Sequence, residues 1–123
     1  MSKILKEASI AIAKLRKKVR WKPGKAEKHL AKRKSMGHVP GDFSIEDYDR
    51  LIQELVSNEG NSVYLYKFGT DRYYGVGGSI RGDKWLVIFS KDGIMETAFP
   101  PDRFEGYLKK RGFEELGKVG EVI

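Results

Sequence analysis

The spacing of hydrophobic residues changes once along the chain, near residue 60. Before that point, apolar side chains recur every three or four positions, which is the period of an amphipathic helix. From Asn61 onward they follow the shorter period of β-strands, and β-branched and aromatic residues are prominent. The pattern predicts helices over residues 2–20, 25–36 and 45–57, and strands over residues 63–68, 73–80, 84–89 and 94–99. A helical half is therefore followed by a sheet.

The links between the predicted strands are short turn sequences rich in glycine and aspartate. Links of this length join antiparallel neighbours, because parallel strands need long crossovers. Pro100-Pro101 ends the last strand, and a short helix over residues 102–111 stops at Gly112. We therefore expect an α+β fold, in which basic N-terminal helices pack on a twisted four-stranded antiparallel sheet with a short C-terminal helix.

The first predicted helix has an apolar stripe on one side and lysines on its other faces. Such a helix packs on the domain, lies across an RNA backbone or binds an anionic membrane surface. We favour packing, with a basic outer face. The expected organisation is an N-terminal helix over residues 1–22, an α+β domain over 23–116 and a tail over 117–123.

The amino-acid composition limits the kinds of site that the chain can form. Its 123 residues support one domain. The absence of cysteine excludes disulfides and thiolate metal sites, and two histidines argue against a histidine-rich metal centre. We expect no metal and no cofactor. No apolar run approaches the roughly 18 residues that span a bilayer, and we expect a cytoplasmic protein.

The positive charge is concentrated in the first third of the chain. The whole chain has a net charge of +7, whereas residues 1–38 carry +11 and residues 39–123 carry −4. A basic block of this kind commonly contacts nucleic acid. The alternative is a solvated lysine-rich surface that stabilises the protein.

His29 is the candidate that gives this basic segment a chemical role. If the segment is helical, Lys25 and Arg33 lie one turn before and after His29, and Lys32 lies beside them. Like charge disfavours the protonated imidazole, so the neutral form is accessible near pH 7, while the same cations can hold a phosphate. Phosphodiester cleavage without a metal requires such an acid–base group beside a phosphate clamp. On spacing alone, a histidine among lysines is more often a surface residue.

Four features in sequence order resemble a known family. Lys28-His29 on a basic helix is followed by a glycine–proline loop, a helix that begins at Ser44 and a last strand that contains Thr97-Ala98-Phe99. This order resembles the superfamily of metal-independent ribonucleases and toxins that groups barnase, EndoU, the tRNase colicins and RelE. The likeness is greatest to colicin D-type tRNase domains and to related phage and polymorphic-toxin domains, over about residues 25–102. Ala26 stands where the colicin D pattern has a further lysine.

The resemblance implies cleavage of RNA by transesterification, in which the ribose 2′-hydroxyl attacks the adjacent phosphate without a metal. It implies a cleft between the His29 helix and the Thr97 strand. The residues to which we assign roles on this basis are His29, Lys25, Lys28 and Thr97 in catalysis, and Lys32, Arg33, His38, Arg81 and Phe99 in RNA binding. The plainer alternatives are an ordinary strand threonine at Thr97 and a core ring at Phe99.

The expected partner is RNA, either tRNA or translated mRNA. A toxin-like ribonuclease of a phage, plasmid or toxin–antitoxin system would also have an acidic antitoxin or immunity protein that covers the positive cleft. Two alternatives stay open. The chain is a non-catalytic RNA- or DNA-binding protein that uses the same basic surface, or it is a structural or protein-binding module.

Overall fold

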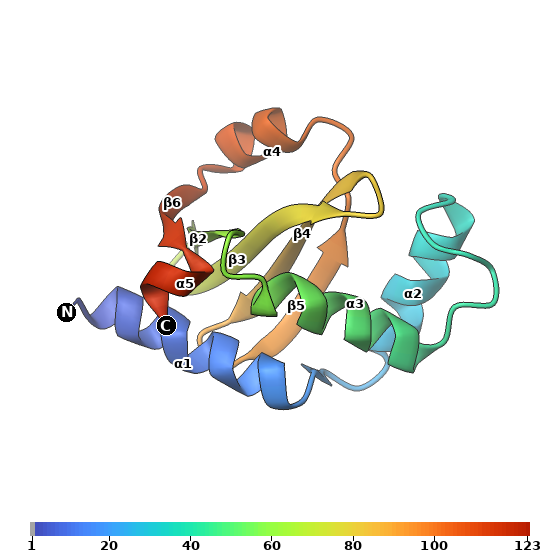
Figure 1. Ribbon diagram of the computed structural model, residues 1–123, viewed down its shortest axis with the longest axis horizontal. Helices are drawn as coiled ribbons and strands as arrows, with labels where there is room; N and C mark the ends of the chain where they lie inside the picture. The colour runs from blue at the N-terminus through green and yellow to red at the C-terminus, as the bar shows by residue number, and fades with distance from the viewer. Residues whose placement is uncertain (1) are drawn as a thin grey trace.

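A computed structural model describes residues 2–123, which form an α+β fold with helices on both faces of a mixed six-stranded sheet (Figure 1). The elements in chain order are α1 (Lys3–Lys17), β1 (Arg20–Trp21), α2 (Lys25–Ser35), α3 (Ile45–Ser57), β2 (Ser62–Phe68), β3 (Asp71–Ile80), β4 (Asp83–Ser90), β5 (Ile94–Phe99), α4 (Phe104–Arg111), β6 (Glu114–Lys118) and α5 (Val119–Val122). Among the helices of residues 2–123, none combines the length and the hydropathy that a membrane span needs.

The sheet has the strand order β1-β5-β4-β3-β2-β6. The four predicted strands form its antiparallel centre, but the prediction of a purely antiparallel four-stranded sheet was wrong. Strand β1 adds a parallel edge beside β5, and β6 adds an antiparallel edge beside β2. Both edge strands lacked a readable pattern, because β1 has two residues and β6 is mainly charged residues and glycine. Their pairing depends on backbone hydrogen bonds to distant strands.

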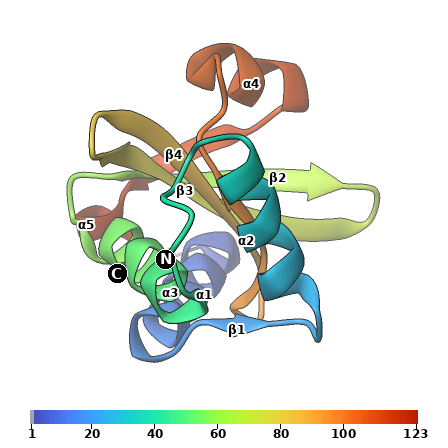
Figure 2. The ribbon, with the colours of Figure 1, turned by 90° about the vertical axis from the view of Figure 1, so that its right-hand side faces the viewer.

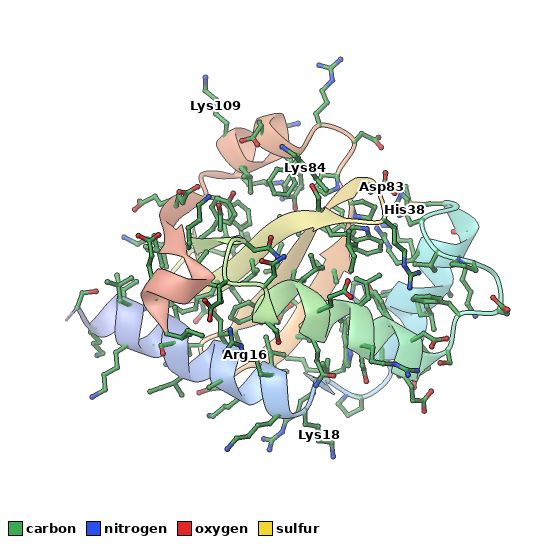
Figure 3. All side chains as sticks on the ribbon, viewed as in Figure 1. Arg16, Lys18, His38, Asp83, Lys84 and Lys109 are labelled. Atoms are coloured by element: carbon green, nitrogen blue, oxygen red, sulfur yellow. The ribbon has the colours of Figure 1, made fainter. Side chains whose placement is uncertain are left out.

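One face of the sheet carries the main hydrophobic core, under α1, α3 and α5. Helix α1 buries Ala8, Ala11, Ile12 and Leu15, which the helical period places on one side. Of the three arrangements considered for this helix, the structure shows packing on the domain. Its lysines are exposed, and Lys18, the residue that follows the helix, also points away from the domain in Figure 3.

Helix α3 has the bounds that the sequence predicts, and its start is determined locally. The Ser44 hydroxyl accepts a hydrogen bond from the Asp47 N–H, and the Asp47 carboxylate accepts one from the Ser44 N–H, each at 3.0 Å. This reciprocal capping box satisfies two backbone donors that the helix itself leaves unpaired.

The opposite face of the sheet carries a smaller cluster under α4 (Figure 2). Its members are mostly aromatic and only partly buried, and include Tyr73, Phe99, Tyr107 and Phe113. The rings lie close to the sheet because strand β3 carries glycine beneath them. A Cβ at Gly75, for example, would meet the ring of Phe113 at 3.3 Å.

Helix α2 lies near the β5 edge of the sheet, where it contacts β5 and α3 (Figure 2). It begins at Gly24, whose φ of 78° lies in the left-handed region that favours glycine. Its buried residues are Ala26, Leu30 and Arg33, which recur at helical spacing. An arginine therefore occupies the third position of an otherwise apolar stripe.

Candidate functional site

His29 and Thr97, which are 68 residues apart in the sequence, lie side by side in the structure. The distance between His29 Nδ1 and the Thr97 hydroxyl oxygen is 3.3 Å, which is a hydrogen-bond contact. Helix α2 supplies the histidine and β5 supplies the threonine. In the sheet register Thr97 lies opposite Ile88, and Phe99 lies opposite Leu86, so both project on the face that α4 covers.

Two aromatic rings pack in series on His29, Trp21 directly and Tyr48 behind Trp21. The Trp21 ring lies 5.7 Å from the imidazole and stacks on Tyr48 at 5.5 Å, both measured between ring centroids. Trp21 Nε1 donates to Asp49 at 3.0 Å, and the Tyr48 hydroxyl donates to the Ala98 carbonyl at 2.6 Å. Each ring is therefore held by a hydrogen bond, and the orientation of His29 is restricted.

The environment of His29 favours its neutral form. Burial of the ring is the largest cause that lowers its pKa below the ordinary 6.5. The positive charges of Lys25, Arg33, Lys28 and Lys32 lower that pKa further. The sequence had indicated the cations, but it had not indicated that burial would matter more. At neutral pH the imidazole can accept a proton.

Arg33 is buried in the wall next to His29. Only 4% of its surface is exposed. Its guanidinium contacts His38 Nδ1 at 3.2 Å and the Met36 sulfur at 3.9 Å, and lies 5.6 Å from the centroid of the Phe99 ring. Within residues 2–123 no carboxylate forms an ion pair with it, and its Nε has no hydrogen-bond partner. The charge is therefore not neutralised by the described part of the chain.

The contact with Arg33 determines the protonation of His38. A guanidinium can only donate hydrogen bonds, so His38 Nδ1 must accept and the Nε2–H of the neutral ring is left as a donor. Burial and the charge of Arg33 lower the pKa of His38, whereas Asp102 and Asp83 raise it less. Figure 3 shows His38 beside Asp83, where the loop after α2 meets the β3–β4 turn.

A cleft of about 690 Å³ opens between α2, the segment after β5 and α4. Its lining combines cations and aromatic rings, and comprises Lys32, Arg33, Met36, His38, Phe99, Pro100, Pro101, Asp102, Arg103, Gly106, Tyr107 and Lys110. A second hollow of about 670 Å³ shares His38 and the residues 100–103 with it. The two hollows are therefore neighbours with a shared wall.

The position of this cleft differs from the sequence-based expectation. We had expected the cleft between His29 and Thr97, but these side chains contact each other and lie outside the lining of the 690 Å³ cleft. The cleft begins one helical turn further along α2, at Lys32 and Arg33. The pair therefore lies next to the cleft and not within its lining.

Four of the nine predicted site residues share the cleft, and three others, in addition to His29 and Thr97, lie outside it. Lys32, Arg33, His38 and Phe99 all line it. Lys25 and Lys28 are exposed on α2, outside that lining.

Arg81 is separate from both groups. Its guanidinium lies 5.4 Å from the centroid of the Phe43 ring and lines a different hollow, with Asp47 and Arg50. Its backbone φ of 53° is in the left-handed region, which a turn between two hydrogen-bonded strands requires. Arg81 is therefore placed by the turn, away from the other predicted residues.

Sequence reasoning missed the contribution of α4. This helix adds Tyr107 and Lys110 to the cleft, and the residue before it adds Arg103. The run Lys109-Lys110-Arg111 was visible as a basic cluster in the sequence, but nothing local indicated that it would face α2 across a gap.

No family model, no curated protein and no solved structure matches this chain. Within residues 2–123, no group of three or more His, Asp or Glu side chains is arranged to hold a metal ion.

Proposed function

We propose that this chain is a metal-independent endoribonuclease that cleaves RNA through attack of a ribose 2′-hydroxyl on the adjacent phosphate. The observation that carries the proposal is the contact between His29 and Thr97, one helical turn from the buried and unneutralised guanidinium of Arg33. This arrangement unites a neutral acid–base group, a hydroxyl donor and a cation.

Arg33 supports the binding of a phosphate. A buried charge is costly unless an opposite charge or hydrogen bonds compensate it. The contacts that residues 2–123 make with this guanidinium are all neutral, and within this range its Nε–H has no acceptor. A phosphodiester in the cleft would supply the missing negative charge, and arginine suits it because the planar fork matches two phosphate oxygens.

His29 is the group that moves protons in this proposal. Its neutral imidazole takes the proton of the 2′-hydroxyl while the 2′-oxygen forms a bond to phosphorus and the bond from phosphorus to the 5′-oxygen breaks. The protonated imidazole then releases this proton while the leaving 5′-oxygen gains one, directly or through water, so the reaction is balanced without a metal and yields a 2′,3′-cyclic phosphate and a 5′-hydroxyl. Thr97 orients the imidazole through the 3.3 Å contact. In this proposal its hydroxyl hydrogen donates to a phosphate oxygen while His29 Nδ1–H donates to the hydroxyl oxygen.

The proposed substrate is tRNA or mRNA, and the proposed biological role is that of a toxin. The basic cleft would then be covered by an acidic antitoxin or immunity protein. Charge complementarity of this kind increases the rate at which two proteins associate. The net charge of +11 on residues 1–38 supports both a nucleic acid and an acidic inhibitor as partners.

The decisive experiment is incubation of 5′-labelled tRNA with the protein in the presence of EDTA. We expect discrete fragments that end in cyclic phosphate. The variant His29→Ala should lower the cleavage rate at least about 100-fold, since acid–base catalysis contributes about 10²- to 10⁴-fold. Lys18→Ala is the matched control, because it removes a cation that points away from the cleft (Figure 3). Unchanged cleavage by His29→Ala would contradict the assignment.

The second candidate is a non-catalytic RNA- or DNA-binding protein. It is favoured by one observation: Arg33, His38 and Phe99 line the cleft, whereas His29 and Thr97 lie outside its lining. Such a protein would produce no tRNA fragments at any protein concentration in the same incubation. It would still bind tRNA and shift it on a native gel.

A further inference from the structure

A series of neighbouring aromatic rings leads away from the cleft along the face of the sheet that α4 covers. Phe99 lines the cleft and contacts Tyr107, whose centroid is 5.2 Å away. Tyr107 is followed by Phe113 at 6.2 Å, and Phe113 stacks on Tyr66 at 4.6 Å with an angle of 9° between the ring planes. The series ends at Phe68, 6.3 Å beyond Tyr66. We call these five rings the aromatic track.

The rings of the aromatic track are incompletely buried. Phe99, Tyr66, Tyr107 and Phe113 are half-buried, and Phe68 is 65% exposed. The main core on the other face of the sheet differs, because its aromatic residues Tyr74, Trp85 and Phe89 are almost completely enclosed. The aromatic track therefore offers ring surface that packing within the protein does not use.

Cations lie over the cleft end of this track. The Arg33 guanidinium lies 5.6 Å from the centroid of the Phe99 ring, and that of Arg111 lies 5.3 Å from the centroid of the Tyr107 ring. Lys110, on the same helix as Arg111, lines the cleft. The acidic residues beside the track come from the sheet and from the segment after β5: Asp102 lines the cleft, Asp71 pairs with Phe68, and Glu114 and Glu115 on β6 pair with β2. A polyanion that follows the rings would therefore place its phosphates on the α4 side.

We propose that the aromatic track is a binding path for single-stranded RNA that extends from the cleft. The proposal rests on the proposed function for the identity of the polymer, and it adds that the bound RNA is unpaired. Bases of a single strand can stack on exposed rings, whereas the bases of a duplex are already stacked on each other. Rings joined to cations are the combination that proteins use to hold single strands without reading their sequence.

The test compares a fluorescein-labelled RNA of about 12 nucleotides with the same RNA annealed to its complement. Both are titrated with full-length protein that carries His29→Ala, so that the RNA stays intact. Two substitutions on this background remove parts of the track, Phe68→Ser at its exposed end and Tyr66→Leu at its centre. Each should weaken single-strand binding about 5- to 10-fold, since stacking on one ring contributes about 1–3 kcal/mol. Duplex binding should be unchanged.

Ile10→Ser is the matched control, because Ile10 is a large apolar residue on α1 that is 48% exposed. It should leave RNA binding unchanged. Salt dependence gives a second readout, since loss of a ring should lower affinity without changing the slope of log affinity against log salt concentration. Leucine at position 66 keeps the packing on Phe113, and circular dichroism checks that both variants fold.

Two results would contradict the proposal that the aromatic track binds single-stranded RNA. One is unchanged single-strand affinity of both variants, and the other is a sedimentation coefficient that falls with Phe68→Ser, which would assign the rings to contact with a second copy of the chain. The outcomes separate this proposal from the ribonuclease proposal. If the protein cleaves RNA but the track variants bind single strands normally, the ribonuclease proposal stands and the track proposal fails. If the protein cleaves no RNA but its binding of single strands depends on the rings, the track proposal stands and the ribonuclease proposal fails.

Discussion

Two arginines of this protein, Arg72 on β3 and Arg33 on α2, are held in opposite ways. Arg72 donates to both carboxylate oxygens of Glu7, at 3.2 and 3.1 Å, and the Tyr74 hydroxyl donates to the same carboxylate at 2.7 Å. Arg33 contacts a histidine nitrogen and a thioether sulfur, and neither carries negative charge. The first guanidinium is neutralised within the protein and the second is not.

The difference separates a structural role from a binding role. Glu7 lies on α1, so its network with Arg72 and Tyr74 fastens the first helix to the sheet. The Arg72 guanidinium is the largest cause that lowers the pKa of Glu7. Arg33 forms no ion pair in the described part of the chain, yet it is the more deeply buried of the two arginines. A protein that keeps such a charge loses stability, which a ligand can restore.

Among the substitutions that test this difference between the two arginines, Arg33→Met should have the largest effect on RNA affinity. Methionine fills a similar volume without charge, so RNA affinity should fall about 30-fold, since a hydrogen bond to a charged group contributes about 1.5–3 kcal/mol. The free protein should become more stable by about 1 kcal/mol, because a buried charge without a counter-ion is removed. For a domain of this size the melting temperature would rise by about 3–5 °C. Fluorescence titration and calorimetry measure the two changes.

Arg72→Met is the counterpart, and its effects should be the reverse. It leaves the Glu7 carboxylate half-buried with only Tyr74 as a donor, so the melting temperature should fall. RNA affinity should stay within about twofold of the unaltered protein, although one positive charge is lost, because Arg72 is outside the cleft. If Arg33→Met lowers stability, or if both variants weaken RNA binding equally, the distinction between the two arginines is wrong.

The cleft region around Arg33 and the Glu7 network around Arg72 should also contribute to the free energy of unfolding over different ranges of pH. The folded pKa values of His29 and His38 are lowered, so below about pH 6.5 the unfolded chain binds protons that these folded histidines resist. Their contribution to the free energy of unfolding is present above that pH and is lost as the pH falls through the lowered values. Glu7, with a pKa lowered from 4.5, keeps its contribution above pH 4.5 and loses it only below.

Urea unfolding followed by tryptophan fluorescence at pH 7.5, 6.5, 5.5, 4.5 and 3.5 measures these two windows. We expect the double variant His29→Gln, His38→Gln to lose less stability than the unaltered protein between pH 7 and 5.5. Glu7→Gln should instead lose less stability than the unaltered protein as the pH falls below 4.5. The same pH profile for the double variant and the unaltered protein would show that the histidines are not held neutral by the fold.

Much of the fold was predictable because its signals are local. Helix α3 and strand β5 have the predicted bounds, since Ser44 with Asp47 marks a helix start and Pro100 ends a strand. Strands β1 and β6 were missed because their pairing partners are far away in sequence. Strand β5 also contains an irregularity: Phe89 pairs with Met95 while Ile88 pairs with Thr97, so Glu96 is an extra residue that no periodicity indicates.

The candidate site was predictable only in part. The proximity of His29 and Thr97 was expected from the resemblance, but the position of the cleft depends on how α4 is placed relative to α2, which no local pattern specifies. The burial of Arg33 did leave a signal. Ala26, Leu30 and position 33 are spaced as one helical stripe, so an arginine stood where an apolar residue was expected. A polar residue at a core position is informative because it is costly.

The smallest expected effect concerns a third kind of cation, Lys22, which pairs with Glu96 at 3.6 Å on the surface. The two side chains are 62% and 34% exposed, so water screens the pair. Glu96→Gln should therefore change the free energy of unfolding by less than about 0.5 kcal/mol and leave RNA affinity within about twofold. Such a result would show that an ion pair stabilises this protein only where it is partly buried, as the pair of Arg72 with Glu7 is, and not where water surrounds it. A loss of stability comparable to that of Arg72→Met would instead mean that the location of a charge does not govern its role here.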